Sequence, residues 1–208
     1  MASNSETGHA INVANLESLS TSANRFGPVY NPSNPLLTVD SMTNLLQNAN
    51  DAMNLVNVAK ANDKIAKAAR DVAFDSLSSL TTRIMNALGS CGVGKLIINS
   101  ARTIVRKIQG VRATPKLSTE EKEALQADGI VKKEVSSSQM NFDSRLSHFD
   151  ELIQLLPGIP QYAPNEEELK VSSLTNYYNT LKTANSAALA TDTQWSNARL
   201  SRNEILYF

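Results

Sequence analysis

A seven-residue pattern of apolar positions follows the proline-rich stretch that ends at Pro35. Twelve of the fourteen positions that this pattern places on one side of a helix are apolar. The fourteen positions are Met42, Leu45, Ala49, Ala52, Val56, Ala59, Asp63, Ala66, Arg70, Ala73, Leu77, Leu80, Ile84 and Ala87. Glycine and proline are absent from 36–88, so the pattern predicts a helix over 38–88, with any break near Asn62 and Asp63. We expect Asn34 or Thr38 to cap its start.

The C-terminal segment repeats this pattern at a distance of 132 residues. When 37–70 is compared with 169–202, eight of the 34 positions are identical. About two or three identities would be expected from shared helical composition alone. The identical pairs are Leu37/Leu169, Val39/Val171, Ser41/Ser173, Thr43/Thr175, Asn44/Asn176, Ala52/Ala184, Ala66/Ala198 and Arg70/Arg202. We therefore predict a second long helix over 166–207, capped by Asn165, with a role related to that of the first.

Two shorter helices are predicted between the long ones, over 95–109 and 137–156, because apolar residues recur there at spacings of three and four. The segment 111–135 contains a Thr-Pro and an Asp-Gly pair, which indicate an irregular insertion. The first 35 residues hold three charged side chains and nineteen Ser, Thr, Asn, Gly or Pro residues, which favours an extended N-terminal arm. Apolar residues of this arm are expected to dock on a neighbouring surface, foremost Ile11, Leu16, Phe26 and Tyr30.

These elements predict an all-α fold, an elongated antiparallel helical bundle with two long helices related by an internal repeat. Residues 1–35 form the extended arm, and 36–208 form a single helical-bundle domain. Five alanines at one of the two heptad positions of the first pattern, namely Ala52, Ala59, Ala66, Ala73 and Ala87, favour close helix packing over a leucine-rich zipper. The expected core includes Leu45, Leu80, Phe142, Phe149, Leu174 and Trp195.

Several short strings resemble a group of bacterial all-helical proteins for which no activity is known. The strings are YNPSNP at 30–35, RTIVRK at 102–107, SQMNFD at 138–143, FDELIQL at 149–155 and ARLSRNEILY at 198–207. The resemblance covers most of the chain from about residue 26 onward. It implies a helical fold and a bacterial source, and it implies no catalytic residue or ligand.

Composition excludes several classes of function. Twenty basic and twenty acidic residues give a formal net charge of zero, so net charge does not favour nucleic acid or an anionic membrane. The N-terminus lacks the pattern of a secretory signal, and no apolar run reaches the roughly 18 residues that cross a bilayer, so we expect a cytoplasmic protein. One cysteine, Cys91, and two histidines provide neither a disulfide framework nor a ligand set for a structural metal.

A glycine-rich segment at 89–96 has the spacing of a phosphate-binding loop ending in Lys95. Leu96 stands where that motif needs Ser or Thr to hold magnesium, and the preceding residues are predicted to be helical. The segment is therefore interpreted as a turn between two helices, and we expect no nucleotide or other cofactor.

Basic residues cluster at 95–116, where six cations occur without an acid. Those of interest as an interaction site are Lys95, Arg102, Arg106 and Lys107. They form an anion-binding face in principle, but the cluster lacks interleaved aromatic residues, so a solvated or salt-bridged face competes with that interpretation. Nucleic-acid and membrane partners are not expected.

Asp63 and Arg70 in the first seven-residue pattern, and Arg202 in its repeat, stand where an apolar residue is expected. These residues need partners, because a buried unpaired charge is costly. We predict a register-setting ion pair of Asp63 with Arg70 or with Arg202. The sequence as a whole predicts a non-enzymatic structural or assembly protein, self-associating into a homo-oligomer or filament through bundle faces and the N-terminal arm. The alternatives are a membrane-interacting bundle and a binder of polyanions or acidic partners through 95–116.

Overall fold

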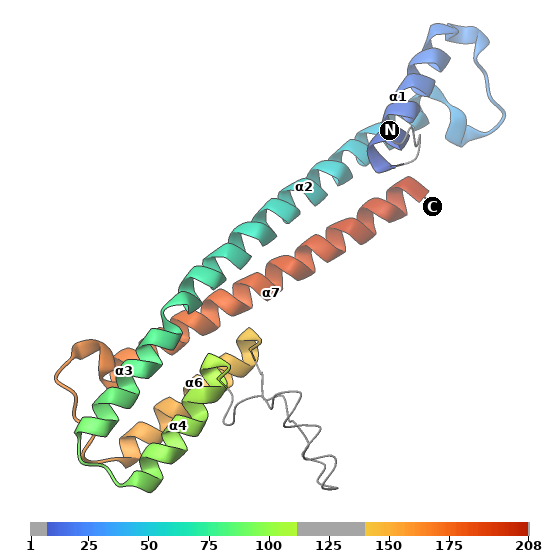
Figure 1. Cartoon of the computed structure of the whole chain (residues 1–208). Helices are drawn as coiled ribbons and strands as arrows, with labels where there is room; N and C mark the ends of the chain where they lie inside the picture. The colour runs from blue at the N-terminus through green and yellow to red at the C-terminus, as the bar shows by residue number, and fades with distance from the viewer. Residues whose placement is uncertain (1–7, 112–139, 208) are drawn as a thin grey trace, which may run out of the picture. The chain divides into compact units, whose positions relative to one another are not determined.

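The computed structural model describes residues 8–111 and 140–207, and these residues are almost entirely helical (Figure 1). The α-helices are α1 (His9–Arg25), α2 (Val39–Asp75), α3 (Leu77–Ser90), α4 (Lys95–Gln109), α6 (Phe142–Leu155) and α7 (Val171–Tyr207). Four 3-10 turns are also present among the described residues: η1 (Gly27–Val29), η2 (Pro35–Leu37), η3 (Leu156–Gly158) and η4 (Glu167–Leu169). The described part contains no β-strand, so the predicted all-α fold is confirmed.

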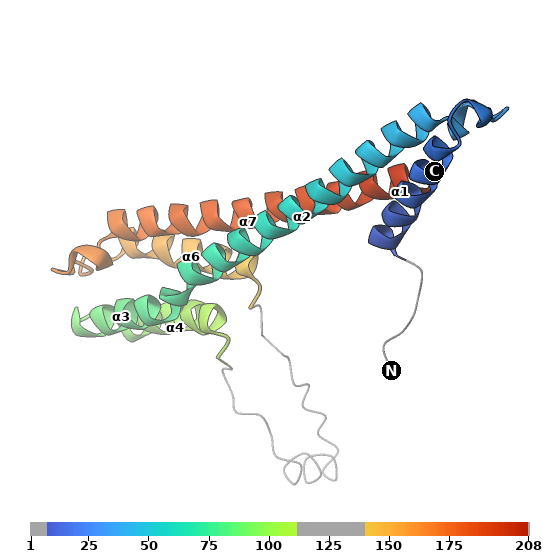
Figure 2. The same cartoon turned by 90° about the horizontal axis from the view of Figure 1, so that it is seen from above.

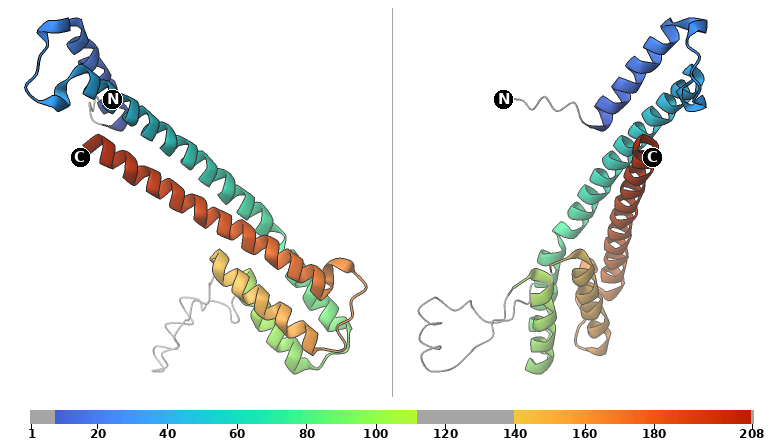
Figure 3. Two further views of the ribbon diagram at one scale, coloured as in Figure 1. Left: turned by 180° about the vertical axis from the view of Figure 1, so that it is seen from behind. Right: turned by 90° about the vertical axis from the view of Figure 1, so that its right-hand side faces the viewer.

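The chain divides into two compact units. Unit 1 comprises Met1–Ala68 and Ala187–Phe208, and unit 2 comprises Ala69–Ser186. Unit 1 therefore contains the hairpin of α1 and the first part of α2, together with the last part of α7 (Figure 2). Unit 2 contains the α3–α4 hairpin and a second hairpin made of α6 and the first part of α7 (Figure 3).

Most predicted helix boundaries agree with the structure to within a few residues. The helix predicted over 95–109 is α4. The helix predicted over 137–156 is α6, which Asn141 caps by accepting a hydrogen bond from the Ser144 backbone N–H at 2.7 Å. Thr38 caps α2, as predicted, because its Oγ1 accepts a hydrogen bond from the Ser41 backbone N–H at 3.3 Å. Asn34 instead caps the preceding turn η2, where its Oδ1 accepts a hydrogen bond from the Leu36 backbone N–H at 3.0 Å. The predicted cap at Asn165 is wrong, because η4 intervenes and α7 begins at Val171. The predicted insertion 111–135 lies outside the described residues, apart from Val111.

The first long helix breaks at Ser76 and not at the predicted Asn62 and Asp63. At this break the Tyr177 hydroxyl donates a hydrogen bond to the Ala73 carbonyl at 2.7 Å, and Ser76 Oγ lies 3.0 Å from the same hydroxyl. Arg145 Nη2 donates to the next carbonyl, that of Phe74, at 3.4 Å. Side chains thus donate hydrogen bonds to backbone carbonyls at the end of α2. Insertion of a side chain into the backbone hydrogen bonds of a helix is an established cause of helix breaks.

The N-terminal segment is not an extended arm, because His9–Arg25 forms the helix α1. One side of α1 packs within its own unit, burying Val13, Ser20 and Ala23. Ser20 Oγ lies 3.5 Å from Thr43 Oγ1 of α2. This packing explains the correction, because tertiary burial stabilises a helix that its Ser- and Asn-rich sequence would not favour in isolation.

The core of unit 2 is a single hydrophobic cluster drawn from the end of α2 and from α3, α4, α6, η3, η4 and α7. Phe149 and Leu174 are fully buried there as predicted, whereas Leu80 and Phe142 are only partly buried at its edge. In unit 1, Val56 and Ala59 of α2 pack with Ala198 of α7, and Trp195 is partly buried beside them. Leu45 is exposed, so its assignment to the core was wrong.

Candidate functional site

Charged residues of α2 and α7 form a network in unit 1 that differs from the predicted ion pair. Lys67 Nζ lies 2.9 Å from Asp63 Oδ2 and 2.7 Å from Asp192 Oδ1, so one ammonium bridges α2 and α7. Its hydrogen bonds to Asp192 and then Asp63 raise the pKa of Lys67. Asp63 is almost fully buried, and this lysine compensates its charge.

The predicted ion pair of Asp63 with Arg70 or Arg202 is therefore wrong. The guanidinium of Arg70 lies over the Phe142 ring, 3.8 Å from its centroid, and that of Arg202 bonds Asn203 Oδ1 at 2.8 Å. Lysine four residues after Asp63 on the same helix is a closer partner than an arginine seven residues away. The i,i+4 spacing was visible in the sequence and would have identified Lys67.

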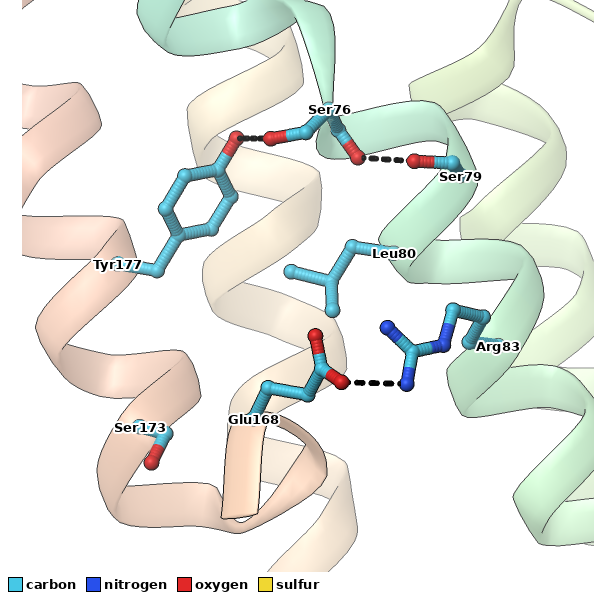
Figure 4. A pocket seen from close by; sticks show the side chains of 7 residues that line it. All are labelled: Ser76, Ser79, Leu80, Arg83, Glu168, Ser173 and Tyr177. Carbon is cyan, nitrogen blue, oxygen red and sulfur yellow. Dashed lines mark hydrogen bonds and ion pairs between the residues drawn. The ribbon is translucent and has the colours of Figure 1, made fainter. Parts of the chain in front are cut away.

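A small pocket of about 250 Å³ lies in unit 2 between α3, η4 and the start of α7 (Figure 4). Arg83 Nη2 and Glu168 Oε1 form an ion pair at 2.6 Å on one side, and the Tyr177 hydroxyl bonds Ser76 on the other. The hydrogen bond from Arg83 lowers the pKa of Glu168 and raises that of Arg83. Sequence reasoning missed this pocket because its residues come from segments about 85 positions apart.

The predicted interaction residues of the N-terminal segment lie in unit 1. Ile11 and Phe26 are exposed, while Leu16 is half-buried on the packed side of α1. Tyr30 is also half-buried, and its hydroxyl donates to the Leu37 carbonyl at 2.7 Å. Ile11 and Phe26 therefore remain free to contact another surface, whereas Leu16 and Tyr30 contribute to the packing and the loop of their own hairpin.

The predicted basic residues lie on α4, in unit 2. Lys95 and Arg102 are exposed, and Arg106 and Lys107 are half-buried in the last turn of the helix. Arg102 Nη1 donates to Asn99 Oδ1 at 3.3 Å. The remainder of the predicted basic region, 112–116, lies outside the described residues. The opposite side of α4 packs into the core through Ala101, Ile104, Val105 and Ile108.

The glycine-rich segment connects α3, which ends at Ser90, to α4, which begins at Lys95. Gly92 has a φ of +69°, a conformation that favours glycine, which explains the residue type at this tight turn. The segment is thus a turn between helices, as predicted.

Cys91 in this turn is half-buried. Burial raises the pKa of nearby Tyr162 to about 12, and its hydroxyl donates to the Leu169 carbonyl at 2.8 Å.

An apolar groove of about 400 Å³ runs between α2 and α7 in unit 1. We call it the α2–α7 groove, and it is lined by Leu55, Val58, Ala59, Asn62, Gln194, Asn197, Ala198 and Ser201. Leu55 and Val58 are exposed along its α2 side, although both are large apolar residues. Charged side chains are absent from this lining, so the groove is suited to an apolar partner surface.

Two kinds of feature are absent from the part of the chain that the structure describes. Residues 8–111 and 140–207 contain no group of three or more His, Cys, Asp or Glu placed to hold a metal ion. Within the same ranges, none of the helices combines the length and the hydropathy needed to cross a membrane. No family model matches the chain, and neither a curated protein nor a solved structure matches it.

Proposed function

We propose that this chain is a non-enzymatic structural protein that self-associates through faces of its helical bundle and through its N-terminal segment. The observation that carries the proposal is the two-sided character of α1. One side packs in cis through Val13, Ser20 and Ala23, and other positions present Ile11 and Leu19 to solvent. Exposed apolar surface of this kind is typical of protein–protein contact sites.

The α2–α7 groove supports the same proposal from a second surface. Leu55 and Val58 line an uncharged depression between two helices. A helix laid into such a groove buries apolar side chains at positions three and four apart. Each Å² of apolar area buried in this way stabilises the associated state by about 25 cal/mol.

Size-exclusion chromatography with light scattering, applied to the full chain over a range of concentrations, tests the proposal. We expect a mass above the 22.6 kDa of one chain, rising with concentration. Leu55→Gln in the groove should weaken the association, and Ile65→Gln is the matched control, because Ile65 is an exposed residue of α2 outside the groove lining. A constant mass of 22.6 kDa up to near-millimolar concentration would contradict the proposal.

Binding of a polyanion or an acidic partner through α4 is the second candidate function. It is favoured by the exposure of Lys95 and Arg102 on a helix whose opposite side is buried in the core. Titration of fluorescent heparin or single-stranded DNA at low and high salt tests it, with Arg102→Gln as the informative variant. Affinity that is independent of salt and of Arg102 would rule out this candidate.

A further inference from the structure

The α1–α2 hairpin of unit 1 and the α6–α7 hairpin of unit 2 have the same local design. Helices α2 and α7 both contain 37 residues, and each begins two residues after a 3-10 turn. Before each turn a tyrosine hydroxyl donates to a carbonyl seven residues later. The pairs are Tyr30 to Leu37 at 2.7 Å and Tyr162 to Leu169 at 2.8 Å. All these features lie 132 residues apart, so the internal repeat includes the loop as well as the long helix.

The first helices of the two hairpins also correspond, with a shift of 133 residues, because the loop of the second is one residue shorter. Five positions of α1 share the spacing of five core positions at and just after α6. The pairs are Val13/Leu146, Leu16/Phe149, Leu19/Leu152, Ser20/Ile153 and Ala23/Leu156. Every member of this set in unit 2 is buried.

Burial differs between the two hairpins at three pairs of corresponding apolar positions. Leu19 is 55% exposed where Leu152 is fully buried, and Leu37 is 46% exposed where Leu169 is 3% exposed. Leu45 is 42% exposed, whereas its counterpart Tyr177 is partly buried against the unit 2 core. The counterparts in unit 2 all contact one hydrophobic cluster. We therefore define the hairpin face of unit 1 as Leu19, Leu37 and Leu45.

Unit 2 shows what covers this kind of face. There α4 packs against α6, and α3 packs against η4, which carries Leu169. Ser76, at the start of α3, bonds the Tyr177 hydroxyl. A second helical hairpin, α3–α4, thus lies over the face of the α6–α7 hairpin (Figure 3).

In unit 1 the last part of α7 contacts the opposite end of α1. The Tyr207 hydroxyl lies 2.8 Å from His9 Nδ1 and 3.5 Å from Asn12 Nδ2, in the first turns of that helix. The loop half of the α1–α2 hairpin, with η2 and the start of α2, extends beyond the end of α7 (Figure 1). The hairpin face lies on this loop half.

We infer that the hairpin face of unit 1 binds the same face of a second copy of this chain, so that two α1–α2 hairpins form a bundle like that of unit 2. The inference rests on the proposed self-association and specifies its surface. Among the described helices, α3–α4 and α6–α7 already cover each other. In the α1–α2 hairpin, by contrast, Leu19, Leu37 and Leu45 stay exposed, so this hairpin face is available to bind a second copy.

Charge also favours a second copy over a charged partner. Within 8–49 only three residues carry a charge, Glu17, Arg25 and Asp40. A nearly uncharged surface meets its own copy without like-charge repulsion, and it offers no complementary charge to a strongly acidic or basic protein. Pairing of identical faces also gives the twofold symmetry that is commonest among homo-oligomers.

Sedimentation velocity of full-length variants tests the inference. Leu19→Gln and Leu37→Gln should each raise the dimer dissociation constant by at least about tenfold, because each removes an apolar side chain from the interface. Leu200→Gln is the matched control, since Leu200 is an exposed leucine of α7 in unit 1 outside the hairpin face, and it should leave the constant unchanged. All three positions are exposed, so the fold is expected to persist, and far-UV circular dichroism verifies this.

A crosslinking experiment identifies the surface independently. In a Cys91→Ser background, Leu19→Cys or Leu37→Cys should give a covalent dimer with a short bismaleimide, and Leu200→Cys should not. Association that survives both glutamine variants and gives no crosslink at the hairpin face would overturn the inference while leaving the proposed self-association intact. A chain that stays monomeric throughout would overturn both.

Discussion

Removal of one hydroxyl at the break between α2 and α3 gives a sharp test of the unit 2 structure. In Tyr177→Phe, the Ala73 carbonyl loses its 2.7 Å bond and Ser76 Oγ loses its acceptor at 3.0 Å. The phenyl ring keeps its edge contact with Phe149, at 5.9 Å between ring centroids, so that the substitution isolates the hydrogen bonds. At about 0.5–1.5 kcal/mol per hydrogen bond, the expected loss of unfolding free energy is about 1–3 kcal/mol.

Urea denaturation followed by far-UV circular dichroism measures this loss. Tyr178→Phe is the matched control, because Tyr178 is a neighbouring, partly buried tyrosine at the edge of the same core. Its hydroxyl has no hydrogen bond to any part of the chain that the structure describes, so we expect a change below about 0.5 kcal/mol. Equal effects of the two variants would refute the explanation of the helix break by the Tyr177 hydroxyl.

Phe149→Ala should lower the unfolding free energy by about 3–5 kcal/mol, because it leaves a cavity in a fully buried site, and an unchanged urea midpoint would show that this side of α6 is misassigned. The lowered pKa of Glu168 means that its ion pair with Arg83 stabilises the fold above the ordinary value of 4.5, and that this contribution is lost as the pH falls through the lowered pKa. Acid titration of stability should therefore be shallower in Glu168→Gln than in the parent chain, and identical curves would contradict the linkage. We also expect no ATP or GTP binding by calorimetry, and micromolar binding abolished by Lys95→Ala would disprove this.

Helix positions were predictable where a long apolar repeat and a cap coincide in sequence. The heptad pattern from Met42 and the Thr38 cap locate α2, and the apolar spacing of Ile104 and Ile108 locates α4. The cap and the apolar spacing are both local features, so they can be recognised within one short stretch of sequence. The 132-residue repeat was also visible, and Tyr30 and Tyr162 extend it to the loops, where the shared Tyr-x-Pro spacing could have been noticed.

Features that depend on distant segments could not be predicted. The break at Ser76 follows from Tyr177, about 100 residues away, and α1 is stabilised by tertiary burial rather than by its composition. Leu45 fits the heptad as well as Met42 does, but the neighbouring helices leave it exposed. The ion pair of Arg83 with Glu168 likewise joins two segments that only the fold brings together.

Amide hydrogen exchange of the full-length chain at low and high protein concentration tests the central claim most directly. Self-association through the hairpin face predicts that protection of α1, η2 and the start of α2 increases with concentration. Protection of the corresponding α6–α7 hairpin should stay constant, because α3–α4 already covers it within each chain. Protection of α1 and η2 that is the same at every concentration would contradict the account.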